Sequence, residues 1–204
     1  MKTWNTLRVV QDDLHVSTLV LNRPERRNAL SQEMVSEVHA CLMELREQKD
    51  LRVLVLTGEG SAFCAGADLK DRSKMTAEQT RNHRDSALRF IELIDTFPVP
   101  VIAMVNGPAF AGGMEVALAC DIRVVSENAS FALTEVVNAG SFPGAGGPVR
   151  LPKLIGRGRA SLIVFTGRRF SAREAYEMGM VEVLVPHDRL REATYALARE
   201  IAGN

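Results

Sequence analysis

Cysteine is scarce in this 204-residue sequence, which contains only Cys41, Cys64 and Cys120. An odd number of cysteines without paired spacing does not fit a disulfide framework or a zinc site. The four histidines are scattered without the spacing of metal ligands, so we expect no bound metal. Reduced thiols are typical of the cytoplasm, which is the compartment we expect for this chain.

Long apolar runs and an excess of one charge are also absent. The 25 basic and 25 acidic residues balance to a formal net charge of zero. No apolar run approaches the ~20 residues that span a bilayer, and residues 1–8 lack the apolar core of a signal peptide. Aromatic residues, at 5%, are too few to interleave with the basic ones as nucleic-acid surfaces require. We therefore expect neither a membrane nor a nucleic acid as partner.

Three common catalytic signatures are missing. The sequence has no glycine-rich loop ending in Gly-Lys-Ser or Gly-Lys-Thr, and no dinucleotide fingerprint follows a predicted strand. Ser61 and Ser141 lack the nucleophile elbow of serine hydrolases. Nucleotide-dependent, nicotinamide-dependent and serine-hydrolase chemistries are therefore disfavoured, and no cofactor is expected.

What the sequence does contain is an alternation of strand-like and helix-like segments, in a chain long enough for a sizeable core. Apolar residues on both sides of Asp12-Asp13 predict two paired strands, over 7–10 and 16–21. Further strands are predicted at 52–57, 101–105 and 122–125. Strands separated by helices indicate a parallel sheet covered on its faces. The loose recurrence of a strand-strand-helix unit favours a stacked spiral over an open doubly wound sheet.

Two helix starts have clear capping signals. Ser31 is a typical N-cap, and Thr76 with Gln79 matches a capping box. The apolar positions that we expect to face inward are Met34, Val38, Cys41, Leu42 and Leu45 in the first helix, and Ala87, Leu88, Ile91 and Ile94 in the second. Pro98 and Pro100 end the second helix.

Two glycine-rich segments, 63–70 and 111–115, lie about forty residues apart. Small residues permit unusual backbone angles and a close approach of ligand to main chain, so each segment can offer a bare backbone N–H. Gly112 lies where a helix is predicted to begin, and unpaired N–H groups at such an end favour a negatively charged oxygen. Two converging N–H groups would form an oxyanion hole.

These segments and several others in the same order resemble the enoyl-CoA hydratase/isomerase family, also called the crotonase family. The matching motifs are Leu21-Asn22-Arg23-Pro24, Asn28-Ala29-Leu30, Phe63 to Lys70, Val105-Asn106-Gly107, Gly112-Gly113 with Glu115, Cys120-Asp121, Glu135, Pro143 to Gly147 and Thr166-Gly167. The resemblance extends from the first hairpin to the closing helix near Ile201. It implies an α/β fold that is a spiral of strand-strand-helix turns, and an enzyme of fatty-acid metabolism that stabilises an enolate of an acyl-CoA thioester.

The resemblance also assigns roles to particular residues. It makes the N–H groups of Ala67 and Gly112 the two donors to the thioester oxygen. It places the CoA moiety along Arg26, Ala65, Ala67, Asp68, Leu69, Lys70 and Gly112, with backbone groups making many of the contacts. Arg26, Arg27 and Lys70 are sensible phosphate partners. CoA is then part of the substrate rather than a cofactor.

Two glutamates are candidate acid/base groups. Glu115 lies three residues after Gly112, so a helix brings its carboxylate to the face that carries the N–H donor. The resemblance assigns Glu115 to the attacking water and Glu135 to protonation of the α carbon. Together they imply syn hydration of a trans-2-enoyl-CoA to a 3-hydroxyacyl-CoA. One departure affects Glu135: the segment from it to Pro143 is one residue longer than in the family, and we expect the extra residue at Asn138-Ala139-Gly140.

Two alternative functions remain open, and the resemblance also implies an oligomeric state. An isomerase of the same family needs one carboxylate to move a proton between carbons, and the presence of two glutamates favours the hydratase. A non-catalytic acyl-CoA-binding or assembly protein with this fold is the second alternative. Finally, the family forms trimers or dimers of trimers. We expect residues 1–204 to be a single core domain that lacks most of the C-terminal helical segment covering the site and completing the trimer contact.

Overall fold

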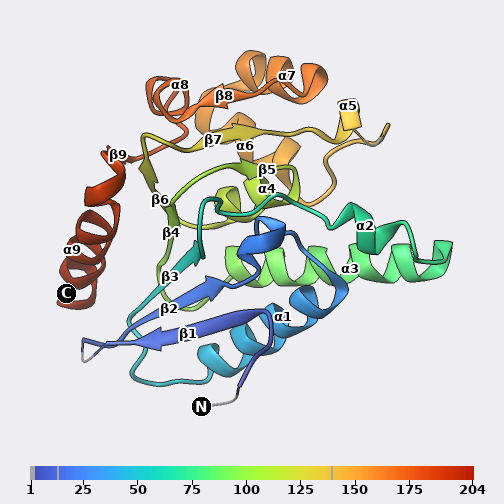
Figure 1. Cartoon of the computed structure of the whole chain (residues 1–204). Coiled ribbons are helices and arrows are strands. Elements are labelled where there is room, and N and C mark those ends of the chain that lie inside the picture. The colour runs from blue at the N-terminus through green and yellow to red at the C-terminus, as the bar shows by residue number, and fades with distance from the viewer. Residues whose placement is uncertain (1–2, 13, 139) are drawn as a thin grey trace.

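The computed structural model describes residues 3–12, 14–138 and 140–204, and its chain forms two sheets surrounded by helices (Figure 1). Asp13 of the first predicted turn and Ala139 of the predicted insertion lie outside these residues. The strands are β1 (Leu7–Gln11), β2 (Val16–Leu21), β3 (Val53–Gly58), β4 (Val101–Val105), β5 (Ala109–Phe110), β6 (Ile122–Ser126), β7 (Ser130–Ala132), β8 (Phe170–Ser171) and β9 (Val183–Val185). The helices are α1 (Gln32–Arg46), α2 (Leu69–Arg72), α3 (Ala77–Asp95), α4 (Gly112–Ala119), α5 (Glu135–Asn138), α6 (Gly147–Ile155), α7 (Arg157–Thr166), α8 (Ala172–Glu177) and α9 (Leu190–Ala202), with short 3₁₀ turns at Pro24–Arg26 and His187–Arg189.

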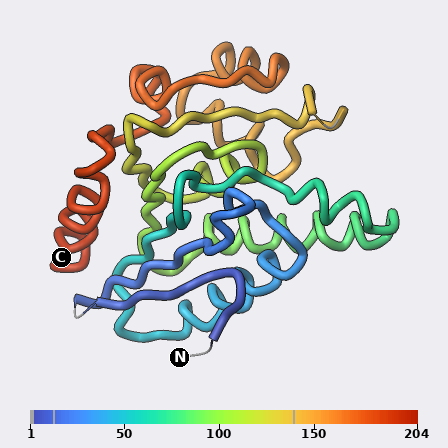
Figure 2. The backbone as a smooth tube through the Cα atoms, viewed as in Figure 1, coloured from blue at the N-terminus to red at the C-terminus, as the bar shows by residue number. Residues whose placement is uncertain are grey.

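The larger sheet has the strand order β1-β2-β3-β4-β6-β9 among the described residues. β1 and β2 pair antiparallel, as a hairpin requires, and every later pair is parallel. The predicted parallel sheet is therefore confirmed. The smaller sheet has the order β5-β7-β8. β5 and β7 of this second sheet follow β4 and β6 of the first, so this part of the chain climbs in strand-strand-helix turns toward the orange end in Figure 2.

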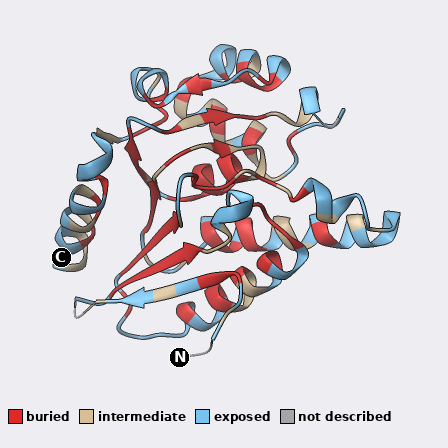
Figure 3. Cartoon of the chain, in the orientation of Figure 1, coloured by how far each residue is buried: buried red, intermediate tan, exposed pale blue. Residues whose placement is uncertain are grey.

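Helices cover both faces of the larger sheet. α1 and α3 lie on one face, where their apolar sides join the main hydrophobic core, and α9 lies on the other over a smaller apolar cluster. The central strands are buried throughout, whereas the outer sides of the helices are exposed (Figure 3). No helix in the described part of the chain combines the length and apolar character needed to cross a membrane.

The predicted helix starts are confirmed by hydrogen bonds. The Met34 amide donates to the Ser31 hydroxyl over 3.1 Å, and Thr76 and Gln79 form the reciprocal capping box. All five inward positions predicted for α1 are buried. On α3, Ile91 and Ile94 are buried and Ala87 is partly buried against the core, as predicted, whereas Leu88 is partly exposed and does not join the core. Ala87 and Leu88 line a cavity.

Asn28 connects the first hairpin to the segment that follows β3. Its side chain is fully buried, accepts a hydrogen bond from the Arg23 amide (2.9 Å) and donates to the carbonyls of Glu59 (2.9 Å) and Ala62 (2.8 Å). Its backbone φ of 55° lies in the left-handed region, which asparagine tolerates better than most residues. Asn28 thereby fixes the start of the glycine-rich segment 63–70.

Replacing Asn28 by alanine is expected to lower the free energy of unfolding by about 3 kcal/mol, because it removes three hydrogen bonds to backbone groups, one of them to the buried carbonyl of Ala62. Chemical denaturation monitored by circular dichroism measures this change. Asn82→Ala, at an exposed position of α3, is the matched control and should change the stability by less than about 0.5 kcal/mol. Equal effects of the two substitutions would contradict this role of Asn28.

Candidate active site

A cavity of about 230 Å³ opens between α2, α3, α5 and the beginning of α4. Figure 1 shows α2, α3 and α5 together at the end of the molecule farthest from α9. The cavity is lined by Leu30, Ala65, Ala67, Leu69, Arg72, Thr80, His83, Arg84, Ala87, Leu88, Ile91, Ala111, Gly112, Glu115, Thr134, Glu135, Asn138, Ser141, Phe142, Gly144 and Ala145. All four predicted catalytic residues therefore meet in one hollow, although they come from three separate segments.

The amides of Ala67 and Gly112 have no hydrogen-bond partner within the described part of the chain, although their neighbours do. The amide of Leu30 donates to the carbonyl of Gly66, and the carbonyl of Leu30 accepts from the amide of Asp68. These two hydrogen bonds involve the residues on either side of Ala67 and leave its N–H unused. The two segments touch, because a Cβ added to Gly66 would lie 3.2 Å from the nitrogen of Gly112. Two unpaired N–H groups in adjacent segments that line one cavity are the arrangement an oxyanion hole requires.

The start of α4 is held in an unusual backbone conformation. Ala111, immediately before the helix, has φ 50° and ψ −126°, which costs on the order of 1–3 kcal/mol for a residue with a Cβ. Its amide is fixed by a hydrogen bond to the carbonyl of Ala132 in β7 (2.8 Å). Gly113 must lack a side chain, because a Cβ there would lie 2.1 Å from the carbonyl oxygen of Cys64. The surrounding structure thus forces the first turn of α4 against the segment 63–70.

Cys64 packs at the contact between these two segments. The side chain is fully buried, and burial raises the pKa of its thiol to about 12. The thiol therefore stays protonated at neutral pH and supplies no nucleophile. This agrees with its interpretation as a small packing residue.

Glu115 is an almost completely buried carboxylate, 2% exposed, on the first turn of α4. Its Oε1 accepts hydrogen bonds from the amides of Ala145 (2.7 Å) and Gly147 (2.9 Å). Burial raises the pKa of Glu115, and these two amides and the charges of Arg150 and Arg84 counteract part of that rise. These amides hold Oε1 in place. No described residue donates a hydrogen bond to Oε2, so this oxygen is available to a ligand in the cavity.

Glu135 is the first residue of α5 and lies in a different environment. Its Oε2 is buried without a hydrogen-bond partner in the described structure. Burial, together with the negative charge of Glu115, raises the pKa of Glu135 to about 7. The two carboxyl groups therefore interact electrostatically, but only Glu115 accepts hydrogen bonds from the amides of Ala145 and Gly147. This difference favours an ionised Glu115 and a protonated Glu135 below pH 7.

The loop after Glu135 forms a backbone hydrogen bond to Glu135 itself. The amide of Ser141 donates to the carbonyl of Glu135 over 3.2 Å, and Gly140 has φ 54°. Of the predicted insertion site, Ala139 lies outside the described residues. The described part of the loop leaves Glu135 in the lining of the cavity.

The residues predicted to hold CoA separate into two groups. Ala65, Ala67, Leu69 and Gly112 line the cavity, whereas Arg26, Asp68 and Lys70 do not. Asp68 instead caps α2 by accepting from the amides of Lys70 and Asp71, and it pairs with Arg23 over 3.0 Å. Arg26 and Lys70 are exposed.

Sequence reasoning did not find the face of α3 that completes the cavity. Thr80, His83, Arg84, Ala87, Leu88 and Ile91 line it at helical spacing. His83 is 8% exposed and its Nδ1 has no hydrogen-bond partner in the described residues, while burial lowers its pKa. The helical spacing of these residues is visible in the sequence, but a helix that faces the protein core has the same spacing.

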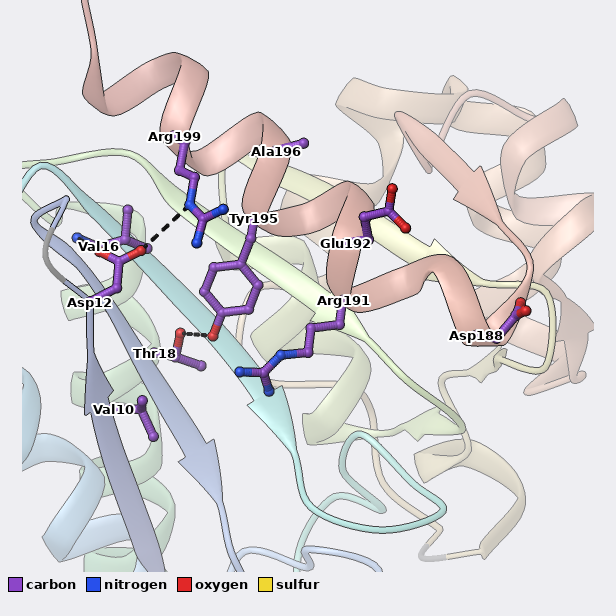
Figure 4. A pocket seen from close by; sticks show the side chains of 10 residues that line it. All are labelled: Val10, Asp12, Val16, Thr18, Asp188, Arg191, Glu192, Tyr195, Ala196 and Arg199. Atoms are coloured by element: carbon purple, nitrogen blue, oxygen red, sulfur yellow. Dashed lines mark hydrogen bonds and ion pairs between the residues drawn. The ribbon is translucent and has the colours of Figure 1, made fainter.

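A second hollow, of about 500 Å³, lies between the first hairpin and α9 (Figure 4). The Tyr195 side chain projects into it from α9, and its hydroxyl lies 2.6 Å from that of Thr18 in β2. Arg191 and Arg199 flank the ring, at 5.0 and 5.9 Å from its centroid. None of the predicted site residues lines this hollow, so its larger volume does not make it the candidate active site.

A family model described as enoyl-CoA hydratase/isomerase matches residues 13–204. The chain belongs to this family. The family's α/β crotonase fold is supported by a crystal structure of an enoyl-CoA hydratase from Bacillus anthracis, which has a TM-score of 0.95 and 45% identity and is matched over 98% of this chain and 78% of that one.

Two relatives indicate how far the family assignment reaches. YngF of Bacillus subtilis (strain 168), named provisionally as an enoyl-CoA hydratase/isomerase, is 45% identical over 192 residues, which are 93% of this chain and 73% of that protein. The human protein named enoyl-CoA hydratase domain-containing protein 2, mitochondrial, is 40% identical over 191 residues, 93% of this chain and 65% of its own length. Membership of the enoyl-CoA hydratase/isomerase family is thus shown. These names do not distinguish hydration from isomerisation, so that choice has to be argued from the residues of the site.

Proposed function

We propose that this protein hydrates trans-2-enoyl-CoA thioesters to 3-hydroxyacyl-CoA. The observation that carries the proposal is one cavity that combines two unpaired amides, on Ala67 and Gly112, with two carboxyl groups of different environment, on Glu115 and Glu135. Hydration needs this combination, because negative charge develops on the thioester oxygen while one proton leaves the attacking water and another is added to the α carbon.

The amides act on the thioester oxygen. When water attacks the β carbon, the electrons of the double bond move toward the carbonyl and negative charge collects on its oxygen. Two donors that are already oriented stabilise this enolate more than the substrate, and each contributes about 3 kcal/mol to lowering the barrier. The first turn of α4 adds its unpaired N–H groups and the positive end of its dipole at the same place.

The carboxyl groups move the protons. Ionised Glu115 accepts a proton from water as the oxygen bonds to the β carbon, and protonated Glu135 delivers its proton to the α carbon as the enolate collapses. One water is added across the double bond, leaving Glu115 protonated and Glu135 ionised. Exchange with solvent restores both groups before the next turnover. The mechanism needs no cofactor, because CoA arrives as part of the substrate.

The rate of hydration is expected to fall as the pH rises through about 7, since Glu135 then loses the proton that it delivers. At acidic pH the rate should also fall, because Glu115 becomes protonated and its raised pKa moves this limb above the ordinary carboxyl range. A pH–kcat profile for crotonyl-CoA measures both limbs, and Glu135→Gln should remove the alkaline one along with most of the activity. A wild-type profile without an alkaline limb would contradict the role given to Glu135.

Parallel assays with 2-enoyl and 3-enoyl thioesters separate the hydratase from the isomerase. Loss of the conjugated enoyl absorbance with a trans-2-enoyl-CoA and formation of the 3-hydroxy product are expected for the hydratase. Faster conversion of a 3-enoyl-CoA to its conjugated isomer would favour the isomerase. Binding of either thioester without turnover would favour the non-catalytic alternative.

We further propose a trimer or dimer of trimers in the cytoplasm. Family membership supports the assembly, and the scarce, buried cysteines are compatible with a reducing compartment. The name of the human relative includes a mitochondrial location, which belongs to that protein. Light scattering after size-exclusion chromatography should give three or six times the mass of one chain, and a monomer would contradict the proposed assembly.

A further inference from the structure

Arg84 is an exposed residue that brings a positive charge to the cavity lining, and no residue that the structure describes pairs with it. It lies on the face of α3 that lines the cavity, one turn before Leu88. Its guanidinium lies over Gly144 in the loop that leads to α6, where an added Cβ would be 3.5 Å from Nη2 and 3.8 Å from Cζ. These are ordinary van der Waals distances, so the guanidinium lies close to the backbone at Gly144.

Two nearby arginines, Arg150 and Arg23, are already engaged, whereas Arg72 also lines the cavity without an ion pair to a described residue and lies on α2, next to the segment assigned to CoA. Arg150 pairs with Asp95 over 3.0 Å and donates to the carbonyl of Ala145 over 2.9 Å, and Arg23 pairs with Asp68. Arg84 has neither an ion pair nor a hydrogen bond to any described residue. Its charge does reach Glu115, since it is among the charges that partly offset the effect of burial on the pKa of that carboxyl. An unpaired guanidinium in a ligand cavity is a ready partner for an anionic group of the ligand.

The position of Arg84 identifies which part of the ligand it can meet. The CoA moiety is assigned to the segment that contains Ala65, Ala67 and Leu69, which carries one of the two oxyanion donors. Arg84 instead lies beside the loop whose amides hold Glu115, the carboxylate that faces the β carbon in the proposed reaction. Beyond the β carbon, the substrate therefore runs toward α3, where Arg84 is the cation next to the apolar side chains of Ala87, Leu88 and Ile91.

We propose that the preferred substrates are 2-enoyl-CoA thioesters whose acyl chain ends in a carboxylate, and that Arg84 binds this distal carboxylate. The inference depends on the proposed hydration and specifies its substrate class. A guanidinium fork can hold a carboxylate through two parallel hydrogen bonds, whereas an alkyl tail would leave the charge of Arg84 unused. The two carboxyl groups of the site repel such a substrate less than two full charges would, because Glu135 is partly protonated near pH 7.

The test compares matched substrates of equal chain length. kcat/KM is measured for glutaconyl-CoA against trans-2-pentenoyl-CoA, and for the corresponding six-carbon pair, with wild type and Arg84→Met. We expect Arg84→Met to lower the ratio of diacid to monoacid kcat/KM by about 10- to 100-fold for at least one chain length. Arg89→Met, at an exposed position of α3 outside the cavity lining, is the control and should leave the ratio within about twofold. Using the ratio removes any effect of Arg84 on Glu115, which both substrates share.

Equal losses for the two substrates would overturn the inference, because Arg84 would then act on Glu115 or on the CoA moiety. An unchanged ratio would overturn it as well. Calorimetry with glutaryl-CoA and pentanoyl-CoA, which lack the double bond, tests the same contact without turnover. If wild type hydrates no thioester, the proposed function fails, but a selective loss of glutaryl-CoA binding in Arg84→Met still supports the carboxylate contact and equal binding still contradicts it.

Discussion

Changing Glu115 to glutamine is expected to lower kcat for hydration of crotonyl-CoA by about 10³-fold. The amide of glutamine cannot accept the proton of the attacking water. Its carbonyl oxygen can still accept the hydrogen bonds that the amides of Ala145 and Gly147 donate to Oε1 in the wild type. The cavity should therefore keep its shape while losing its base. Stopped assays of 3-hydroxy product measure the effect.

The control for this substitution is Glu92→Gln, at an exposed position of α3 outside the cavity lining. It should retain kcat within about twofold, and both variants should unfold within about 1 kcal/mol of wild type. A Glu115→Gln enzyme that is folded and retains more than about one tenth of wild-type kcat would contradict the assignment of Glu115 as the base.

Changing Gly66 to alanine is expected to lower kcat by about 10²- to 10³-fold by separating the two oxyanion donors. The added Cβ would lie 2.8 Å from the carbonyl oxygen of Phe110, 2.9 Å from Cβ of Ala111 and 3.2 Å from the nitrogen of Gly112. These atoms belong to residues 110–112, directly before and at the start of α4, so the segment carrying Ala67 must move away from them. Steady-state kinetics should show the loss mainly in kcat, since the donors act more strongly on the enolate than on the substrate.

Gly179→Ala separates this effect from ordinary backbone strain. Gly179 has φ 84°, close to the 86° of Gly66, but a Cβ there would meet only the carbonyl of Leu154 at 3.8 Å. Both variants should lose a similar stability from the left-handed conformation, and Gly179→Ala alone should retain its activity. Comparable kcat values for the two variants would show that the spacing of the segments is unimportant.

Local signals were sufficient to predict most of the regular elements. Ser31 and the pair Thr76 and Gln79 cap helices by hydrogen bonds between near neighbours in sequence, so their effect does not depend on the rest of the fold. β4 has the predicted bounds because its short apolar run is enclosed by proline and asparagine. The spiral itself was implied chiefly by the family resemblance.

The composition of the cavity depends on contacts that the sequence pattern does not encode. Ala87 and Leu88 were predicted to face the core because a helix face gives the same periodicity whether it meets protein or a cavity. Arg84 and His83 escaped notice for the same reason, since isolated polar residues on a helix are usually solvated. Glu115 and Glu135 were found because the motifs around them are shared with the family, and their different pKa values follow from burial and partners that only the fold creates.

A crystal structure of the protein with a bound 3-hydroxyacyl-CoA product would test the oxyanion hole directly. We expect the thioester oxygen to lie about 2.7–3.1 Å from both the nitrogen of Ala67 and the nitrogen of Gly112, with the carboxyl groups of Glu115 and Glu135 beside the β and α carbons. A thioester oxygen beyond hydrogen-bonding distance of either nitrogen would contradict the proposed oxyanion hole.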